Sequence, residues 1–157
     1  MNSVPPPLSL RERVTIEPMR PNDLDQVLAI ENSSFQNPWS RDQFEAELDR
    51  RQAVCLAARN KGCILGYLVF WLVPPKIHVL NIAVRPEPRR QGLGGLLLDY
   101  MFILGRETGV KEIMLEVRTS NEPAMEFYRS AGFVPAGRRE DYYPDNNEDA
   151  LVMIKYI

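Results

Sequence analysis

A basic, glycine-rich stretch, RRQGLGG at residues 89–95, contains the residues whose types first suggest binding chemistry. It lies between an apolar run that predicts a strand and a helical pattern that begins at Gly92. Glycines let backbone N–H groups approach a ligand closely, and a helix start offers unpaired N–H groups and the positive end of a dipole. The stretch therefore predicts an anion site. The alternative is a helix start made flexible by glycines that binds no ligand.

The spacing of the glycines excludes two common phosphate-binding motifs. A dinucleotide fingerprint needs a third glycine three positions after Gly94, where Leu97 stands. A Walker loop needs glycine, lysine and then serine or threonine, whereas Gly95 is followed by two leucines. An anion at this stretch must therefore be held in another geometry.

Two side chains downstream have the chemistry of a proton acceptor and a proton donor. Glu116 is an acid in an apolar strand, where it shares a face with Met114. Tyr128 lies in a helical pattern, and a phenol stays protonated at neutral pH and can protonate a leaving group. Each residue also has a structural alternative: an ion-paired or solvated glutamate, and a half-buried helix aromatic.

Cysteine and histidine usage argues against a metal centre. Cys55 and Cys63 have seven residues between them, which fits neither a metal-ligand pair nor a disulfide framework. The single histidine, His78, excludes a histidine-rich site, and we assign it no catalytic role. We therefore expect no metal.

Hydrophobic periodicity and turn signals predict an α/β domain in the order β-α-α-β-β-β-α-β-α-β-β. Asn22 is expected to cap the first helix, Ser40 and Gln43 to form a capping box, and Asn121 to cap the last helix. The closing segment is expected to contain a loop around Tyr142 with a solvated charged run at 138–141. Strands are expected at residues 14–16, 53–59, 64–73, 77–84, 113–117, 133–137 and 149–157, and the longest helix at 92–107.

Composition limits the class of protein. The 157 residues are 45% apolar and 25% charged with a net charge of −2, as in one ordinary globular domain. The longest apolar run, 64–73, is too short to span a bilayer, and the N-terminus lacks the apolar core of a secretory signal. We expect a flexible lead-in at 1–13, one domain at 14–157, a cytoplasmic location, and no binding to nucleic acid or membrane.

Four segments in a fixed order resemble the GNAT N-acetyltransferases. NIAVRPEPRRQGLGGLLLDYM is similar to the acetyl-CoA-binding segment of that family, whose Arg/Gln-x-x-Gly-x-Gly/Ala core is matched at residues 89–94. MLEVRTSNEPAMEFYRSAGF and YYP follow at family-like distances, and FQNPWS precedes them. Together they resemble the RimI-type branch over about residues 14–157. Phe127 stands where that branch commonly has leucine.

The resemblance implies a GNAT fold with acetyl-CoA as co-substrate. This fold has a mixed, mostly antiparallel central sheet flanked by helices on both faces, with a splayed pair of strands that holds acetyl-CoA. One splayed strand then pairs with the pantetheine arm, and the glycine-rich stretch binds the pyrophosphate. Asn121 is equally well explained as a helix cap. The implied coenzyme-binding residues are Ile82, Ala83, Val84, Arg89, Arg90, Gln91, Gly92, Leu93, Gly94, Gly95 and Asn121.

The implied reaction is acetyl transfer to the α-amine of the N-terminal alanine of a small-subunit ribosomal protein. In the family, Glu116 corresponds to the proton acceptor and Tyr128 to the proton donor. No nucleophilic serine or cysteine motif accompanies them, so we expect direct attack by the amine in a ternary complex. Glutamate is a weak base for an amine, so Glu116 acts either directly, in an environment that strengthens it, or through a water.

The acceptor is expected to enter between two aromatic turns, which contribute Phe35, Trp39, Tyr142 and Tyr143. The alternatives are that Trp39 only packs against the next helix and that the tyrosines only form a packed turn. Two other functions stay open: a GNAT enzyme that acetylates lysine side chains or a small-molecule amine, and a non-catalytic acyl-CoA-binding module. The presence of both Glu116 and Tyr128 argues against the module.

Overall fold

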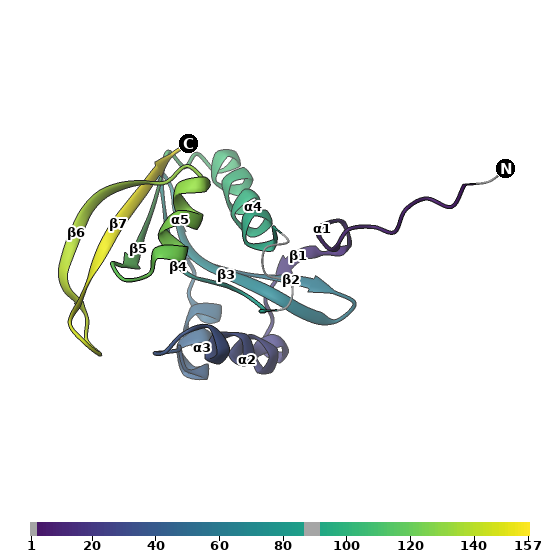
Figure 1. The fold of residues 1–157 in the computed structure, drawn as a ribbon, viewed down its shortest axis with the longest axis horizontal. Coiled ribbons are helices and arrows are strands. Elements are labelled where there is room, and N and C mark those ends of the chain that lie inside the picture. Colours follow the sequence, from purple (N-terminus) through teal and green to yellow (C-terminus); the bar gives the residue numbers. More distant parts are fainter. Residues whose placement is uncertain (1–2, 87–91) are drawn as a thin grey trace.

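A seven-stranded sheet organises the protein in the computed structural model, which describes residues 3–86 and 92–157 (Figure 1). The strand order is β1-β2-β3-β4-β5-β7-β6, and only β4 and β5 are parallel neighbours. The strands are β1 (Thr15–Pro18), β2 (Ala53–Asn60), β3 (Cys63–Val73), β4 (Lys76–Val84), β5 (Glu112–Arg118), β6 (Val134–Tyr143) and β7 (Glu148–Tyr156).

Helices cover both faces of this sheet, with α4 and α5 on one face and α2 and α3 on the other (Figure 1). This arrangement confirms the predicted mixed, mostly antiparallel α/β fold. No helix in the described part of the chain is both long and apolar enough to cross a bilayer. The helical segments are α1 (Leu10–Arg13), the 3-10 turn η1 (Pro21–Asp23), α2 (Leu24–Ser34), α3 (Arg41–Asp49), α4 (Leu93–Glu107) and α5 (Glu122–Ser130).

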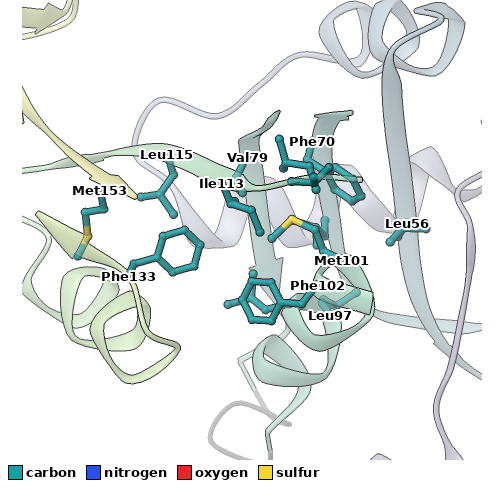
Figure 2. Close-up of a cluster of buried hydrophobic side chains, with 14 of the residues drawn as sticks. Leu56, Phe70, Val79, Leu97, Met101, Phe102, Ile113, Leu115, Phe133 and Met153 are labelled. Atoms are coloured by element: carbon teal, nitrogen blue, oxygen red, sulfur yellow. The ribbon is translucent and has the colours of Figure 1, made fainter. Parts of the chain in front are cut away.

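The larger core lies between the sheet and α4. Leu97 and Met101 are spaced by one helical turn and are both fully buried, so one stripe of α4 faces the strands. Figure 2 shows this stripe pointing at Phe70, Val79 and Ile113, which come from three neighbouring strands. Apolar burial of this kind supplies most of the stabilisation that holds a helix on a sheet.

The smaller core lies under α2 and α3, on the opposite face. Leu24 and Val27 of α2 and Phe44 of α3 are buried against strand residues such as Tyr67. The predicted start of α3 is confirmed by the Ser40 side chain, which accepts a hydrogen bond from the Gln43 N–H at 3.2 Å, and by the reciprocal bond at 2.9 Å. The ring centroids of Trp39 and Phe44 lie 5.1 Å apart, as expected for a hydrophobic staple.

The parallel pair β4 and β5 separates after three paired residues. Lys76, Ile77 and His78 pair with residues 112–114, but β4 continues to Val84 and β5 to Arg118. Beyond this point, the strand pairs among the described residues are β4 with β3 and β5 with β7. We call the gap between residues 79–84 and 115–118 the fork; it is the splayed pair of strands that the resemblance predicts.

The last hairpin differs from the prediction. The sequence predicts a strand at 133–137 followed by a solvated loop, but β6 runs on through the charged segment to Tyr142 and Tyr143. Because β6 is an edge strand and nearly all of its residues are exposed, it has no apolar alternation to reveal it. Polar contacts hold it instead; the Arg138 Nε donates to the Asp149 carboxylate at 2.6 Å.

The start of the first long helix also differs from the prediction. Asn22 is not the cap, because residues 21–23 form a 3-10 turn and α2 begins at Leu24. The Asp23 carboxylate accepts the Arg20 N–H at 2.9 Å and both guanidinium NH groups of Arg59 at 2.8 and 2.9 Å. The Arg59 hydrogen bonds lower the pKa of Asp23.

The segment before β1 contains a short helix that the sequence does not predict. It is α1, and its Arg11 forms an ion pair of 3.0 Å with Asp99 of α4. The division into a lead-in at 1–13 and a domain at 14–157 remains a prediction.

Candidate active site

A cavity of about 1980 Å³ lies at the fork and is lined from both faces of the sheet. Its walls come from the turn between α2 and α3, from the two fork strands, from one side of α4 and α5, and from the ends of β6 and β7. The predicted residues Arg89, Arg90 and Gln91 lie outside the described residues. The predicted site residues on the wall are Phe35, Trp39, Ile82, Ala83, Val84, Gly92, Leu93, Gly94, Gly95, Glu116, Asn121, Tyr128 and Tyr143.

The β4 side of the fork suits an extended ligand arm. Residues 80–84 line the cavity, and in the described part of the chain residues 80–83 form no backbone pair with β5. An extended chain with amide groups can pair with such an edge much as an added strand would. This edge therefore fits the pantetheine arm of acetyl-CoA.

The start of α4 suits a phosphate group. Gly92 has a φ of 83°, and the first bond of the helix runs from the Leu96 N–H to the Gly92 carbonyl at 2.9 Å. The N–H groups of residues 93–95 precede that bond and have no acceptor within the helix. They sit at the positive end of the dipole of a 15-residue helix and line the cavity.

The two glycines inside this first turn serve different purposes. A Cβ built on Gly95 would meet nothing within 4 Å, so this position faces open space. A Cβ on Gly94 would lie 3.0 Å from the Cζ of Phe127, so this glycine lets α4 approach α5 closely. An added side chain at Gly95 would therefore occupy open space beside the first-turn N–H groups of α4.

Asn121 lies where it can both cap α5 and contact a ligand in the cavity. Its side-chain oxygen accepts the Ala124 N–H at 3.2 Å, which confirms the predicted cap of α5. It also lines the cavity. Capping and contact with a ligand are therefore compatible at this residue.

Glu116 lies on the α2/α3 face of β5. Ile113, Leu115 and Val117 belong to the core under α4, so Met114 and Glu116 point to the other face. The Glu116 side chain is only 7% exposed, and its Oε2 lies 2.6 Å from the Nε2 of His78. Its Oε1 lies 3.5 Å from the Arg139 Nε. The sequence does not predict either partner.

Tyr128 approaches the cavity from the opposite face. Its ring packs against Phe127 at 5.3 Å and Phe133 at 5.7 Å between centroids, next to the core under α4. Burial, and then the neighbouring Tyr143 hydroxyl, raise the pKa of Tyr128 well above its usual value. The hydroxyl therefore keeps its proton and remains a hydrogen-bond donor at neutral pH.

The fork explains how groups from opposite faces reach one cavity. A continuous sheet would separate Glu116 from Tyr128, but both line the cavity where β4 and β5 diverge. A carboxylate and a phenol hydroxyl thus flank one cavity of about 1980 Å³. Among the described residues, no three histidine, cysteine or acidic side chains come together as metal ligands.

A buried carboxylate holds the aromatic turn between α2 and α3. Glu31 is 1% exposed, and its Oε2 accepts the Trp39 N–H at 2.9 Å. Its Oε1 accepts the Asn81 amide at 2.7 Å and the Tyr67 hydroxyl. Glu31 is not among the predicted site residues, although Leu24, Val27 and Glu31 follow the i, i+3, i+7 spacing of a buried stripe.

The two tyrosines at the end of β6 occupy different positions. Tyr143 lines the cavity, and the guanidinium carbon of Arg118 lies 3.9 Å from the centroid of its ring. Burial raises the pKa of Tyr143 to about 12. Tyr142 packs edge-on against Tyr143 at 5.0 Å and is 41% exposed, but it is not part of the cavity wall. Arg118 also binds Asp145 at 3.0 Å, so it anchors the hairpin turn to β5.

Comparison with known proteins agrees with this architecture. The sequence profile of the Acetyltransferase (GNAT) family matches residues 24–133. The chain is 39% identical, over 92% of its length and 96% of the relative's, to a Bacillus subtilis protein named "Putative ribosomal protein bS18-alanine N-acetyltransferase". It is 35% identical to the ribosomal protein bS18-alanine N-acetyltransferase of Escherichia coli K12, over 88% and 95% of the two chains.

Solved structures agree with the sequence comparison. The crystal structure of the ribosomal-protein-S18-alanine N-acetyltransferase from Escherichia coli superposes with a TM-score of 0.83 at 32% identity, covering 92% of this chain and 94% of that one. Members of the matched family use acetyl-CoA as acetyl donor. The fold, the fork and the family match lead to one conclusion: this chain belongs to the GNAT family of acetyltransferases.

Proposed function

We propose that this acetyltransferase modifies the N-terminal alanine of a small-subunit ribosomal protein, in the cytoplasm, with acetyl-CoA as donor. The observation that carries the proposal is the fork cavity, which has Glu116 on one side and Tyr128 on the other. The names of the two relatives at 39% and 35% identity support the choice of acceptor. The alternative of a lysine or small-amine acceptor has no comparable support.

The donor side of the cavity holds acetyl-CoA in this proposal. Acetyl-CoA supplies an acetyl group activated as a thioester. The backbone of Ile82, Ala83 and Val84 pairs with the pantetheine arm, and a backbone N–H near Ala83 polarises the thioester carbonyl. The N–H groups of Leu93, Gly94 and Gly95 bind the pyrophosphate at the start of α4, together with the predicted residues 89–92. Asn121 contacts the coenzyme while it caps α5.

An N-terminal α-amine is an easier acceptor than a lysine. An α-amino group has an ordinary pKa of about 7.7–8.0 and a lysine one of about 10.4. Reaching the neutral nucleophile therefore costs about 3.5 kcal/mol more for lysine at neutral pH. A site with one carboxylate as base is better matched to the α-amine.

Glu116 accepts the proton of the attacking amine, and Tyr128 donates a proton to the departing thiolate. Both groups are held by neighbours, Glu116 by His78 and Tyr128 by the packed rings of Phe127 and Phe133. The amine attacks the thioester carbonyl directly, and no covalent acetyl-enzyme forms. Each group then handles one proton in each turnover.

The acceptor peptide enters over the α2/α3 face in this proposal. Phe35 and Trp39 line the cavity there, and Tyr143 lines it from β6. Tyr142, which is half-exposed beside Tyr143, contacts the peptide outside the cavity wall.

A panel of acceptors tests the proposal. The protein is incubated with acetyl-CoA and peptides that begin with alanine, serine, methionine or proline, with N-terminally blocked lysine peptides, and with polyamines. Mass spectrometry identifies the acetylated atom. We expect the highest kcat/KM for a ribosomal-protein peptide beginning with alanine. A preference for lysine side chains or polyamines would replace the proposed acceptor, and acetyl-CoA binding without transfer to any acceptor would favour a binding module.

A further inference from the structure

We infer that His78 is a positioning residue for the candidate base Glu116, an inference that rests on the proposed function. The His78 Nε2 and the Glu116 Oε2 are 2.6 Å apart. A nitrogen lone pair and a carboxylate lone pair repel, so a proton must lie between atoms this close. The imidazole thus holds one of the two carboxylate oxygens through a charge-assisted hydrogen bond.

The contact lies where backbone pairing between the two strands stops. His78 pairs with Met114 in the last pair before the fork, and Glu116 is two residues further along β5 on the same face as Met114. In the described structure no later backbone pair joins β4 to β5. The hydrogen bond between His78 and Glu116 therefore joins β4 to β5 just beyond their last backbone pair, at the base of the fork.

His78 packs against Trp71, whose side chain also binds α3. The Trp71 ring lies edge-on to the imidazole, with centroids 6.0 Å apart and planes at 87°. The Trp71 Nε1 donates to the Glu47 carboxylate of α3 at 2.7 Å. A chain of contacts thus runs from α3 to Glu116, and it restricts the rotamers of the imidazole.

The geometry assigns different tasks to the two residues. Glu116 lines the cavity and is 7% exposed, whereas His78 is 28% exposed and is not on the cavity wall. His78 therefore acts through Glu116 and does not touch the acceptor. It provides the donor that keeps Oε2 in place.

The remaining oxygen is then free to serve as the base. Among the described residues, Oε1 has only a 3.5 Å ion pair with Arg139, whose side chain is 51% exposed. In the reaction, the N–H bond of the amine breaks and an O–H bond forms at Oε1, while the proton shared with His78 stays where it is. Without His78, the carboxylate is free to turn toward Arg139, so the orientation of the base is lost while both substrates still bind.

Replacement of His78 by residues that differ in donor and reach tests this role. Steady-state kinetics are measured with acetyl-CoA and the best acceptor of the panel. We expect His78→Leu to lower kcat about 10- to 100-fold, as for other partners that orient a reacting group, with both KM values within about twofold. His78→Gln keeps an N–H donor of similar reach, so we expect its kcat to be at least about tenfold above that of His78→Leu if His78→Leu loses 100-fold. The side chain of His78→Asn is shorter, and we expect its kcat to stay as low as that of His78→Leu.

A double-mutant cycle with Glu116→Gln separates positioning from an independent effect. If His78 works through Glu116, adding His78→Leu to Glu116→Gln causes no further loss of kcat. A double variant slower than Glu116→Gln by the full His78→Leu factor would contradict the inference. So would an unchanged kcat in His78→Leu, or a KM increase with kcat intact. Acetyl-CoA affinity of each variant verifies that the fork remains folded.

The inference and the proposed function fail in different ways. Wild-type protein that acetylates lysines but no N-terminus contradicts the proposed acceptor, and the His78 cycle is then measured on lysine. Wild-type protein that acetylates the alanine peptide, with His78→Leu at full kcat, contradicts only the role of His78.

Discussion

The two faces of the sheet are joined to their helices by different kinds of contact. Among the described residues, the fully buried side chains under α4 and α5 are apolar. The face under α2 and α3 also buries Asp23, Glu31 and Glu47. Each of these acids binds a partner on the sheet, and the partners are Arg59 for Asp23, Tyr67 and Asn81 for Glu31, and Trp71 for Glu47.

This difference matches the two halves of the reaction. Apolar contacts have no preferred direction and tolerate changes of side-chain shape, whereas hydrogen bonds fix the orientation of the groups that they join. The face with directional contacts also carries Trp39, His78 and Glu116, on the proposed acceptor side. The apolar face supports Tyr128 and the start of α4, on the proposed donor side, where α4 presents backbone N–H groups and Tyr128 its hydroxyl.

The largest effect on stability is expected at Glu31. Glu31→Met keeps the volume but leaves the Trp39 N–H, the Tyr67 hydroxyl and the Asn81 amide without their acceptor. At about 1–3 kcal/mol for each unpaired group, the free energy of unfolding falls by about 3 kcal/mol or more. Urea denaturation measures it, and the KM for the acceptor peptide rises as the turn loosens.

Two control variants test whether the two faces differ in how their contacts stabilise the fold. Met101→Leu, a similar-sized change in the apolar core, is expected to cost less than about 1.5 kcal/mol. Glu31→Gln keeps an acceptor for the Trp39 N–H and is expected to restore the acceptor KM of wild type. Equal losses for Glu31→Met and Met101→Leu would remove the distinction between directional and apolar contacts.

The next largest effect is expected on the donor side. Gly95→Asp adds a negative charge in open space beside the first-turn N–H groups of α4. Like-charge contact with the pyrophosphate weakens acetyl-CoA binding by about 100-fold or more, as measured by calorimetry. Gly137→Asp adds the same charge in open space on β6 and serves as the matched control. Unaltered affinity in a folded Gly95→Asp protein would rule out phosphate binding at this turn.

The smallest effect is a pH dependence of stability from Asp23. Arg59 lowers the pKa of Asp23 in the folded state, so the stabilisation is complete above the ordinary value of about 3.9 and is lost as the pH falls below it. We expect wild type to exceed Asp23→Asn by about 1 kcal/mol at pH 7. In denaturation curves this difference shrinks as the pH falls from about 4 through the lowered folded-state pKa of Asp23; a constant difference would show that the charge is not responsible.

The features that could be predicted well from the sequence are those with local signals. The spacing of Leu97 and Met101 gives the buried face of α4, and the alternation in β5 gives the side on which Glu116 lies. Gly109, with a φ of 87°, stands just after the α4 C-cap residue Thr108, as its type predicts. Each of these features depends on residues within a few positions of one another.

The acceptor half was predicted less well, because its contacts join distant residues. Glu31 binds Tyr67 and Asn81, 36 and 50 positions away, and periodicity shows that Glu31 is on a buried stripe without naming a partner. His78 looks like an incidental strand residue until β4 and β5 are placed side by side. Only the tertiary structure brings the acids and their partners together.

The most direct test of the account is the pH dependence of two single variants. If Glu116 accepts the amine proton, Glu116→Gln loses about 10²- to 10⁴-fold in kcat/KM at pH 7. At pH 9.5 an α-amine arrives neutral, so this deficit should shrink at least tenfold. Tyr128→Phe, whose defect concerns the leaving thiolate, should keep its deficit at both pH values. Deficits that respond equally to pH in the two variants would contradict the assignment of the base to the acceptor face and the acid to the donor face.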